Sequence, residues 1–102
     1  MNSKITAREG WIEVEIDGNC EYSKFEEAAT LLRKKFKVRF IEKLHDLDSA
    51  YWDFVYKDCE LTLHFNLGIS LFPKKFGEST ATENECAKKI GSLLFEAINQ
   101  SS

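Results

Sequence analysis

The chain has 102 residues, of which 43% are hydrophobic and 30% are charged. This length fits one domain with a real hydrophobic core and leaves little room for two. The formal net charge of -3 at pH 7 argues against direct nucleic-acid binding, which depends on a basic surface. If the protein has a charged partner, we expect that partner to be basic.

Neither a leader nor a membrane-spanning segment is expected. Residues 1–8 contain no continuous apolar stretch, and no apolar run approaches the roughly 20 residues that a spanning helix needs. The cysteines Cys20, Cys59 and Cys86 are scattered and lack C-x-x-C spacing. An odd, scattered set is typical of reduced cysteines, so we expect a cytoplasmic protein.

The first third of the chain predicts two strands and a helix. Across residues 11–16 apolar side chains alternate with glutamates, the pattern of a strand with one buried face. A shorter strand around residues 5–7 would precede it, joined by a turn at 9–10. The helix should begin near Ser23, which would form a capping box with Glu26. Its apolar stripe follows helical spacing and consists of Phe25, Ala28, Ala29, Leu32 and Phe36.

Four more strands are predicted, at residues 38–44, 51–57, 59–66 and 69–72. Adjacent apolar residues at 40–41 interrupt the alternation of the first, which indicates a bulge or a two-sided strand. A tight turn at residues 57–58 joins the second strand to the third. Because the links between these strands are short, they should form an antiparallel meander.

A second helix is expected to open at Thr82, with Glu85 completing another capping box. Gly91 would weaken this helix by up to about 1 kcal/mol relative to alanine, but a small residue there would allow close packing on the sheet. The apolar stripe of this helix consists of Cys86, Ile90, Leu93, Leu94 and Ala97.

These elements predict one α+β domain spanning residues 1–102, with the order (β)β-α-β-β-β-β-α. The sheet would be an antiparallel meander of five or six strands. Each helix has one apolar stripe and must cover a sheet face. We expect both helices on the same face, packed against Trp52, Phe54, Leu61, Leu63 and Phe65.

Candidate catalytic and metal-binding residues are few. His45, with Asp46 and Asp48, could act as a metal ligand or a general base, but a solvated turn explains the same residues more simply. Cys59 and Cys86 fall on apolar stripes and are expected to fill the core. The glycines are isolated and form no phosphate-binding loop. We therefore expect no catalytic residues, no metal site and no cofactor.

The sheet face opposite the helices is the strongest candidate for binding. It would present aromatic, acidic and hydrogen-bonding groups, a mixture that is typical of protein-binding surfaces, although an ordinary solvated face explains it equally well. Ser70 and Phe72 would lie beside the candidate partner-binding residues. Those candidates are Tyr51, Asp53, Glu60, Thr62, His64 and Asn66, with Asp58 in the adjoining turn; Val55 would lie on the same face.

The segment 52–73, W-D-F-V-Y-K-D-C-E-L-T-L-H-F-N-L-G-I-S-L-F-P, combines an aromatic hairpin, an L-x-L-H-F strand and a G-I-S-L-F strand before the closing helix. This pattern resembles small bacterial immunity proteins of toxin–immunity pairs, such as those of contact-dependent growth inhibition. The resemblance covers roughly the C-terminal half and carries over no binding residue, because those proteins vary widely.

The resemblance implies a non-catalytic cytoplasmic protein that binds and neutralises a cognate protein toxin, with a basic nuclease domain as one candidate. Acidic side chains such as Asp53, Asp58 and Glu60 would then face a basic toxin surface. We expect a monomer or a weak homodimer, without direct nucleic-acid or membrane binding.

Two other functions remain open. A small-ligand-binding or regulatory domain would have a pocket between sheet and helices, lined by Trp52, Tyr56 and Phe95. An enzyme centred on His45 and Asp48 would lose activity on His45→Ala with its fold intact.

Overall fold

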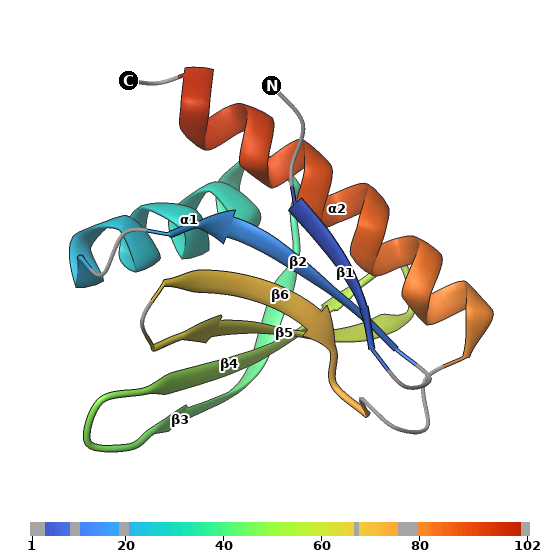
Figure 1. The fold of residues 1–102 in the computed structure, drawn as a ribbon, viewed down its shortest axis with the longest axis horizontal. Coiled ribbons are helices and arrows are strands. Elements are labelled where there is room, and N and C mark those ends of the chain that lie inside the picture. Colours follow the sequence, from blue (N-terminus) through green and yellow to red (C-terminus); the bar gives the residue numbers. More distant parts are fainter. Residues whose placement is uncertain (1–3, 9–10, 19–20, 67, 76–79, 101–102) are drawn as a thin grey trace.

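The computed structural model describes residues 4–8, 11–18, 21–66, 68–75 and 80–100. Its elements follow the order β-β-α-β-β-β-β-α (Figure 1), which confirms the predicted α+β fold. The elements are β1 (Lys4–Arg8), β2 (Trp11–Asp17), α1 (Tyr22–Lys34), β3 (Arg39–His45), β4 (Ala50–Tyr56), β5 (Cys59–Phe65), β6 (Ile69–Pro73) and α2 (Ala81–Gln100).

All six strands form one antiparallel sheet with the spatial order β1-β2-β6-β5-β4-β3. Strands β3 to β6 form the predicted meander. The N-terminal hairpin of β1 and β2 joins this meander at β6, so segments more than fifty residues apart in the sequence lie side by side. The pairing of β2 with β6 shifts register between Glu15 and Asp17, which is typical of a β-bulge.

Strand alternation divides the sheet into two faces. Leu61 of β5 is opposite Phe54 of β4 and Pro73 of β6, while Leu63 is opposite Trp52 and Leu71. Side chains directly opposite each other in antiparallel strands point to the same side, so these residues share one face. This apolar face contains most of the fully buried large side chains of the sheet.

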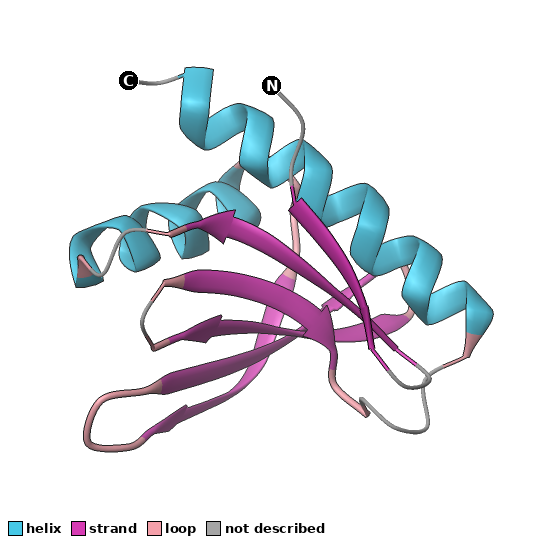
Figure 2. Cartoon of the chain, in the orientation of Figure 1, coloured by secondary structure: helices cyan, strands magenta, loops and turns pink. Residues whose placement is uncertain are grey.

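Both helices lie over this apolar face, as the sequence predicted (Figure 2). In α1, the fully buried Phe25 packs its ring 4.9 Å from that of Trp52 and 5.6 Å from that of Phe65. In α2, Gly91 rests directly on Val14 of β2: a Cβ atom at position 91 would lie 2.8 Å from a Val14 methyl carbon. The small residue therefore serves close packing.

The helix starts differ from the predicted ones. Glu21 is the N-cap of α1 and makes no side-chain capping hydrogen bond; Ser23 is already inside the helix, so a capping box with Glu26 is wrong. For α2 the capping box forms two residues earlier than predicted, between Thr80 and Glu83. The Glu83 amide donates to the Thr80 hydroxyl at 3.1 Å, and the Thr80 amide donates to the Glu83 carboxylate at 2.9 Å.

The later strands follow the sequence closely. The register of β3 against β4 shifts between Phe40 and Glu42, which confirms a bulge at this edge of the sheet. Lys57 and Asp58 have φ values of 48° and 67°, as a tight hairpin turn that matches the strand twist requires. The predicted turn at 9–10 and Cys20 lie outside the described residues. No described helix is long and apolar enough to cross a membrane.

Candidate functional site

We call the face of the sheet that points away from α1 and α2 the outer face. Strand register places on it the side chains that alternate with the buried set. Among the described elements no helix packs on this face. Its residues are Lys4, Thr6 and Arg8 of β1, Trp11, Glu13 and Glu15 of β2, Ser70 and Phe72 of β6, Glu60, Thr62 and His64 of β5, Tyr51, Asp53 and Val55 of β4, and Arg39, Glu42 and Leu44 of β3.

Four rings form a continuous row across the outer face, one from each of four neighbouring strands. The ring centroids of Trp11 and Phe72 are 5.5 Å apart in an edge-to-face arrangement. Those of Phe72 and His64 are 5.7 Å apart, and His64 stacks on Tyr51 at 4.5 Å. Such contacts are worth about 0.5–1.5 kcal/mol per aromatic pair beyond the area they bury. This ring row is therefore held rigidly by its own contacts.

His64 is the most constrained member of the ring row. Burial lowers the pKa of its imidazole below the ordinary value, although the negative charge of Glu13 acts in the opposite direction. Its Nε2 atom is buried and has no hydrogen-bond partner among the described residues. A neutral imidazole between Tyr51 and Phe72 then functions mainly as a flat ring.

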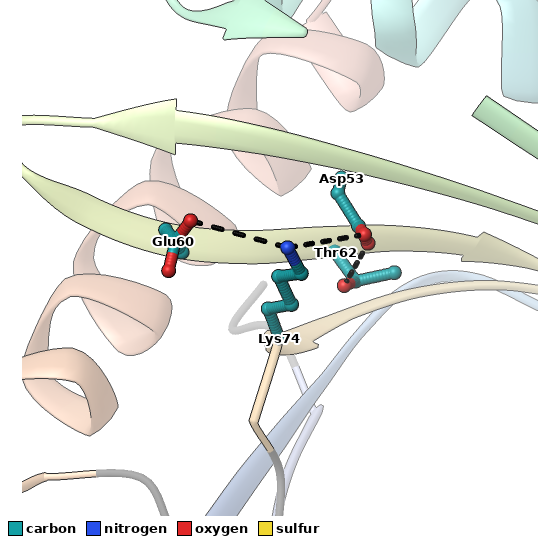
Figure 3. Close-up of polar contacts among 4 residues, drawn as sticks. All are labelled: Asp53, Glu60, Thr62 and Lys74. Carbon is teal, nitrogen blue, oxygen red and sulfur yellow. Dashed lines mark hydrogen bonds and ion pairs between the residues drawn. The ribbon is translucent and has the colours of Figure 1, made fainter. Parts of the chain in front are cut away.

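Beside the ring row, Lys74 joins two carboxylates (Figure 3). Its Nζ atom lies 4.0 Å from Asp53 Oδ2 and 3.9 Å from Glu60 Oε1. The Thr62 hydroxyl donates a hydrogen bond of 2.6 Å to Asp53 Oδ1. The Lys74 amide also donates to the Glu60 carbonyl at 3.1 Å, so the chain just after β6 keeps the ammonium group in place.

The outer face carries charges of both signs. Five of its residues carry carboxylates, and the cations are Arg39 and Lys74 together with Lys4 and Arg8, which the register of β1 places opposite Glu15 and Trp11. Lys74 sits at the limit of ion-pair distance from Asp53 and Glu60 and offsets their charge in part. The Asp53 and Glu60 carboxylates therefore lie beside the ring row on the β4–β5 part of the face.

The structure brings most of the predicted partner-binding residues together. Tyr51 is opposite His64, and Asp53 is opposite Thr62, in the register of β4 and β5; Glu60 continues the same face. The remaining two are peripheral. Asp58 lies in the β4–β5 turn, and Asn66 lies just beyond β5, where both are exposed.

The outer face is less open than the sequence suggested. Thr62 is 4% exposed, Phe72 7% and Ser70 9%, because the neighbouring rings and the Lys74 cluster cover them. These three residues therefore lie beneath the side chains that a partner could reach. The side chains of β4 and β5 that reach the solvent on this face are half-buried and are Tyr51, Asp53, Val55, Glu60 and His64.

Sequence reasoning missed two important members of this surface. Trp11 falls on the same alternation as the exposed glutamates of its strand, but nothing in the sequence indicates that β2 pairs with β6 and brings its indole against Phe72. Lys74 lies just beyond the strand that was predicted at residues 69–72. Its continuation of the β6 alternation was the available signal.

The Nε2 atom of His45 is already engaged in a hydrogen bond within the protein. Its Nε2 atom accepts a hydrogen bond of 3.1 Å from the indole N–H of Trp52, which occupies the lone pair that a base or a metal ligand would use. The β3–β4 hairpin that contains Asp46 and Asp48 is closed by a hydrogen bond of 2.8 Å from the Asp46 amide to the Ser49 carbonyl. No three described His, Cys, Asp or Glu side chains gather as a metal site would require.

Two of the surface depressions formed by described residues lie on the side of the sheet that carries the helices. One, of about 460 Å³, lies between the start of α1 and the β3–β4 hairpin and includes Tyr22, His45 and Phe65. The other, of about 160 Å³, lies between α1 and β3 and includes Trp52. Neither contains Tyr56 or Phe95, so neither is the ligand cavity that the sequence suggested.

Comparisons with protein-family models, curated proteins and solved structures gave no match for this chain.

Proposed function

We propose that this chain is a non-catalytic protein-binding domain that uses its outer face to hold a basic partner protein. The observation that carries this proposal is the ring row, fixed across four strands on the face that the helices leave uncovered and bordered by carboxylates. Rigid aromatic side chains that are already ordered before binding lose little conformational freedom on contact, which favours affinity.

The chemistry of the surface favours a protein over the other partner classes. Nucleic acid would meet a chain with a net charge of -3 and the Asp53 and Glu60 carboxylates beside the ring row, which opposes phosphate binding. A small molecule would need a concave site, whereas the outer face is one side of a sheet filled by its own side chains. A folded partner with exposed lysines and arginines would meet Asp53 and Glu60 as complementary charges, which speeds association and fixes orientation.

Lys74 gives this proposal a specific electrostatic consequence. As an internal cation it competes with a basic partner for Asp53 and Glu60. Removing its charge should expose both carboxylates to the partner, so Lys74→Gln should accelerate association. Asp53→Asn should have the opposite effect, and it would also weaken the anchor that Thr62 uses.

For the identity of the partner we propose a cognate toxin, which makes this chain an immunity protein. The support is the resemblance of residues 52–73 to such proteins, together with the ring row and the Asp53 and Glu60 carboxylates beside it. An immunity protein is encoded beside its toxin, so the product of the neighbouring gene is the partner to test. The full chain should co-purify with that product and protect cells that express it.

Binding kinetics with the neighbouring gene product test the assignment of the surface. We expect a several-fold rise in association rate for Lys74→Gln at low salt, falling toward the parent value as salt screens the charges. Lys88→Gln is the matched control, because Lys88 is an ion-paired lysine on α2, away from the outer face. An equal rise in both variants would show that overall charge alone acts, and failure to bind or protect would refute the function.

A further inference from the structure

The larger of the two depressions on the helix side of the sheet has the size of a small-molecule site. It has a volume of about 460 Å³ and lies between the first turn of α1 and the β3–β4 hairpin, which meet at the same end of the sheet (Figure 1). Ligand pockets typically span about 300–1,000 Å³. The depression shares no residue with the ring row of the outer face, so a ligand here would be separate from the proposed partner.

Three rings from three elements line the depression. The ring of Tyr22 at the start of α1 is perpendicular to that of Phe65 on β5, with the two centroids 5.5 Å apart. The ring of His45 on β3 has its centroid 6.5 Å from that of Tyr22. Several rings that stand at different angles form the aromatic cages in which proteins hold organic ammonium groups, because a cation over a ring face is attracted by the ring quadrupole.

The β3–β4 hairpin supplies negative charge to the same depression. Asp46 and Asp48 both line it, and the described residues that line it include no lysine or arginine. His45 adds no positive charge, because its Nε2 atom accepts the indole N–H of Trp52 at 3.1 Å and an imidazole that accepts at Nε2 is neutral. The start of α1 contributes a partial positive charge of about half an elementary charge, which the two carboxylates outweigh.

The lining of the depression is already ordered without a ligand. The Asp46 amide donates to the Ser49 carbonyl at 2.8 Å, which closes the hairpin, and the Asp46 Oδ1 atom accepts from the Leu47 amide at 2.8 Å, which orients the carboxylate. Tyr22 also packs 5.5 Å, ring centroid to ring centroid, from the fully buried Phe25. A site whose groups are in place before binding loses little conformational freedom when a ligand arrives.

Leu47 at the hairpin tip indicates a further property of the ligand. It lines the depression and is 96% exposed, so nearly all of its apolar surface is in contact with water. A ligand that carries an apolar group beside its charge would cover part of this surface, and burial of apolar area is favourable.

We propose that this depression binds a small organic cation that carries an apolar group. The ammonium or guanidinium group of the ligand lies between the rings of Tyr22 and Phe65 and the carboxylates of Asp46 and Asp48, and its apolar group covers Leu47. Rings without the two carboxylates would suit a neutral ligand equally well, so preference for a cation is the property that identifies the site.

The test titrates the isotope-labelled full chain with benzylamine, which is protonated near neutral pH, and with benzyl alcohol, which has a similar shape and no charge. The methyl groups of Leu47 and Ala50 report on the depression, and those of Leu93 on α2 report on a remote surface. We expect saturable shifts of the first two with benzylamine and an affinity for benzyl alcohol that is about fivefold weaker or less. Equal affinities, or no saturable shift with benzylamine, would overturn the proposal.

Single charge-removing variants test the role of the carboxylates. Asp46→Asn and Asp48→Asn keep the size of the side chain, and each should weaken benzylamine binding by about two- to fivefold while leaving benzyl alcohol binding unchanged. Asp58→Asn is the matched control, because it removes one exposed carboxylate from the β4–β5 turn at the opposite end of β4. An equal loss in all three variants would show that net charge alone acts and would refute the site.

Discussion

Gly91→Ala tests the closest contact between α2 and the sheet. The new Cβ would lie 2.8 Å from Val14 Cγ1, 2.9 Å from Val14 Cβ and 3.0 Å from Val14 Cγ2, whereas carbon atoms pack favourably at about 3.5–4.0 Å. Val14 is fully buried and β-branched, so its side chain has no alternative position near the backbone. The helix itself must shift.

The magnitude follows from two opposing contributions. Overpacking of a close core contact costs about 1–3 kcal/mol, while replacing a mid-helix glycine by alanine gains about 1 kcal/mol in helix propensity. We expect the free energy of unfolding to fall by about 1 kcal/mol, which lowers Tm by about 4–8 °C for a chain of this length. Urea unfolding followed by circular dichroism measures the change.

Gly18→Ala is the matched control for the same substitution. A Cβ at position 18 would meet no other atom within 4 Å, so this variant should be neutral or more stable by up to about 1 kcal/mol. Gly91→Ala combined with Val14→Ala should lose less stability than the sum of the two single changes, because the removed methyl groups cause part of the clash. A Gly91→Ala chain as stable as the parent would refute the reasoning.

Three further predictions concern single side chains. Phe25→Ala removes a fully buried ring between Trp52 and Phe65 and should cost about 3–5 kcal/mol in urea unfolding; a loss below about 1 kcal/mol would mean that α1 contributes little to the core. Burial lowers the pKa of His64, so the folded state binds a proton at His64 less readily than the unfolded state does. Stability should therefore decline as the pH falls below about 6.5. His64→Gln should flatten that decline, and an unchanged pH profile in this variant would contradict the prediction. Burial raises the pKa of the Cys59 thiol from its ordinary value of 9.0 to about 12. The contribution of this thiol to stability is therefore complete below pH 9 and should be lost as the pH rises toward 12. Cys59→Ala should show a smaller loss over that interval, and an identical loss would count against burial of the thiol.

The sequence predicted local structure well where one pattern dominated. The alternation of β5 and the bulge in β3 appear in the structure as predicted, because each depends on side chains that are neighbours in the sequence or one strand apart. The packing role of Gly91 also followed from the sequence, since a glycine within an apolar helical stripe indicates close contact.

The sequence did not determine which distant strands pair, or which of two equivalent capping boxes forms at the start of α2. The T-x-x-E pattern occurs at Thr80 and again at Thr82, and the structure uses the first. The pairing of β2 with β6 creates the contact of Trp11 with Phe72, and it depends on how the N-terminal hairpin meets the meander. One of the four rings, Trp11, therefore joins the ring row only through the three-dimensional fold.

Chemical-shift mapping by NMR tests whether the outer face binds the partner. The isotope-labelled chain would be titrated with the product of the neighbouring gene, observing the methyl groups of Val55 and Thr62, the ring of His64, and the methyl groups of the exposed Leu93 on α2. If the outer face binds, the first three should shift while Leu93 does not. Shifts confined to Leu93 and the helix surfaces, with the outer face unchanged, would contradict it.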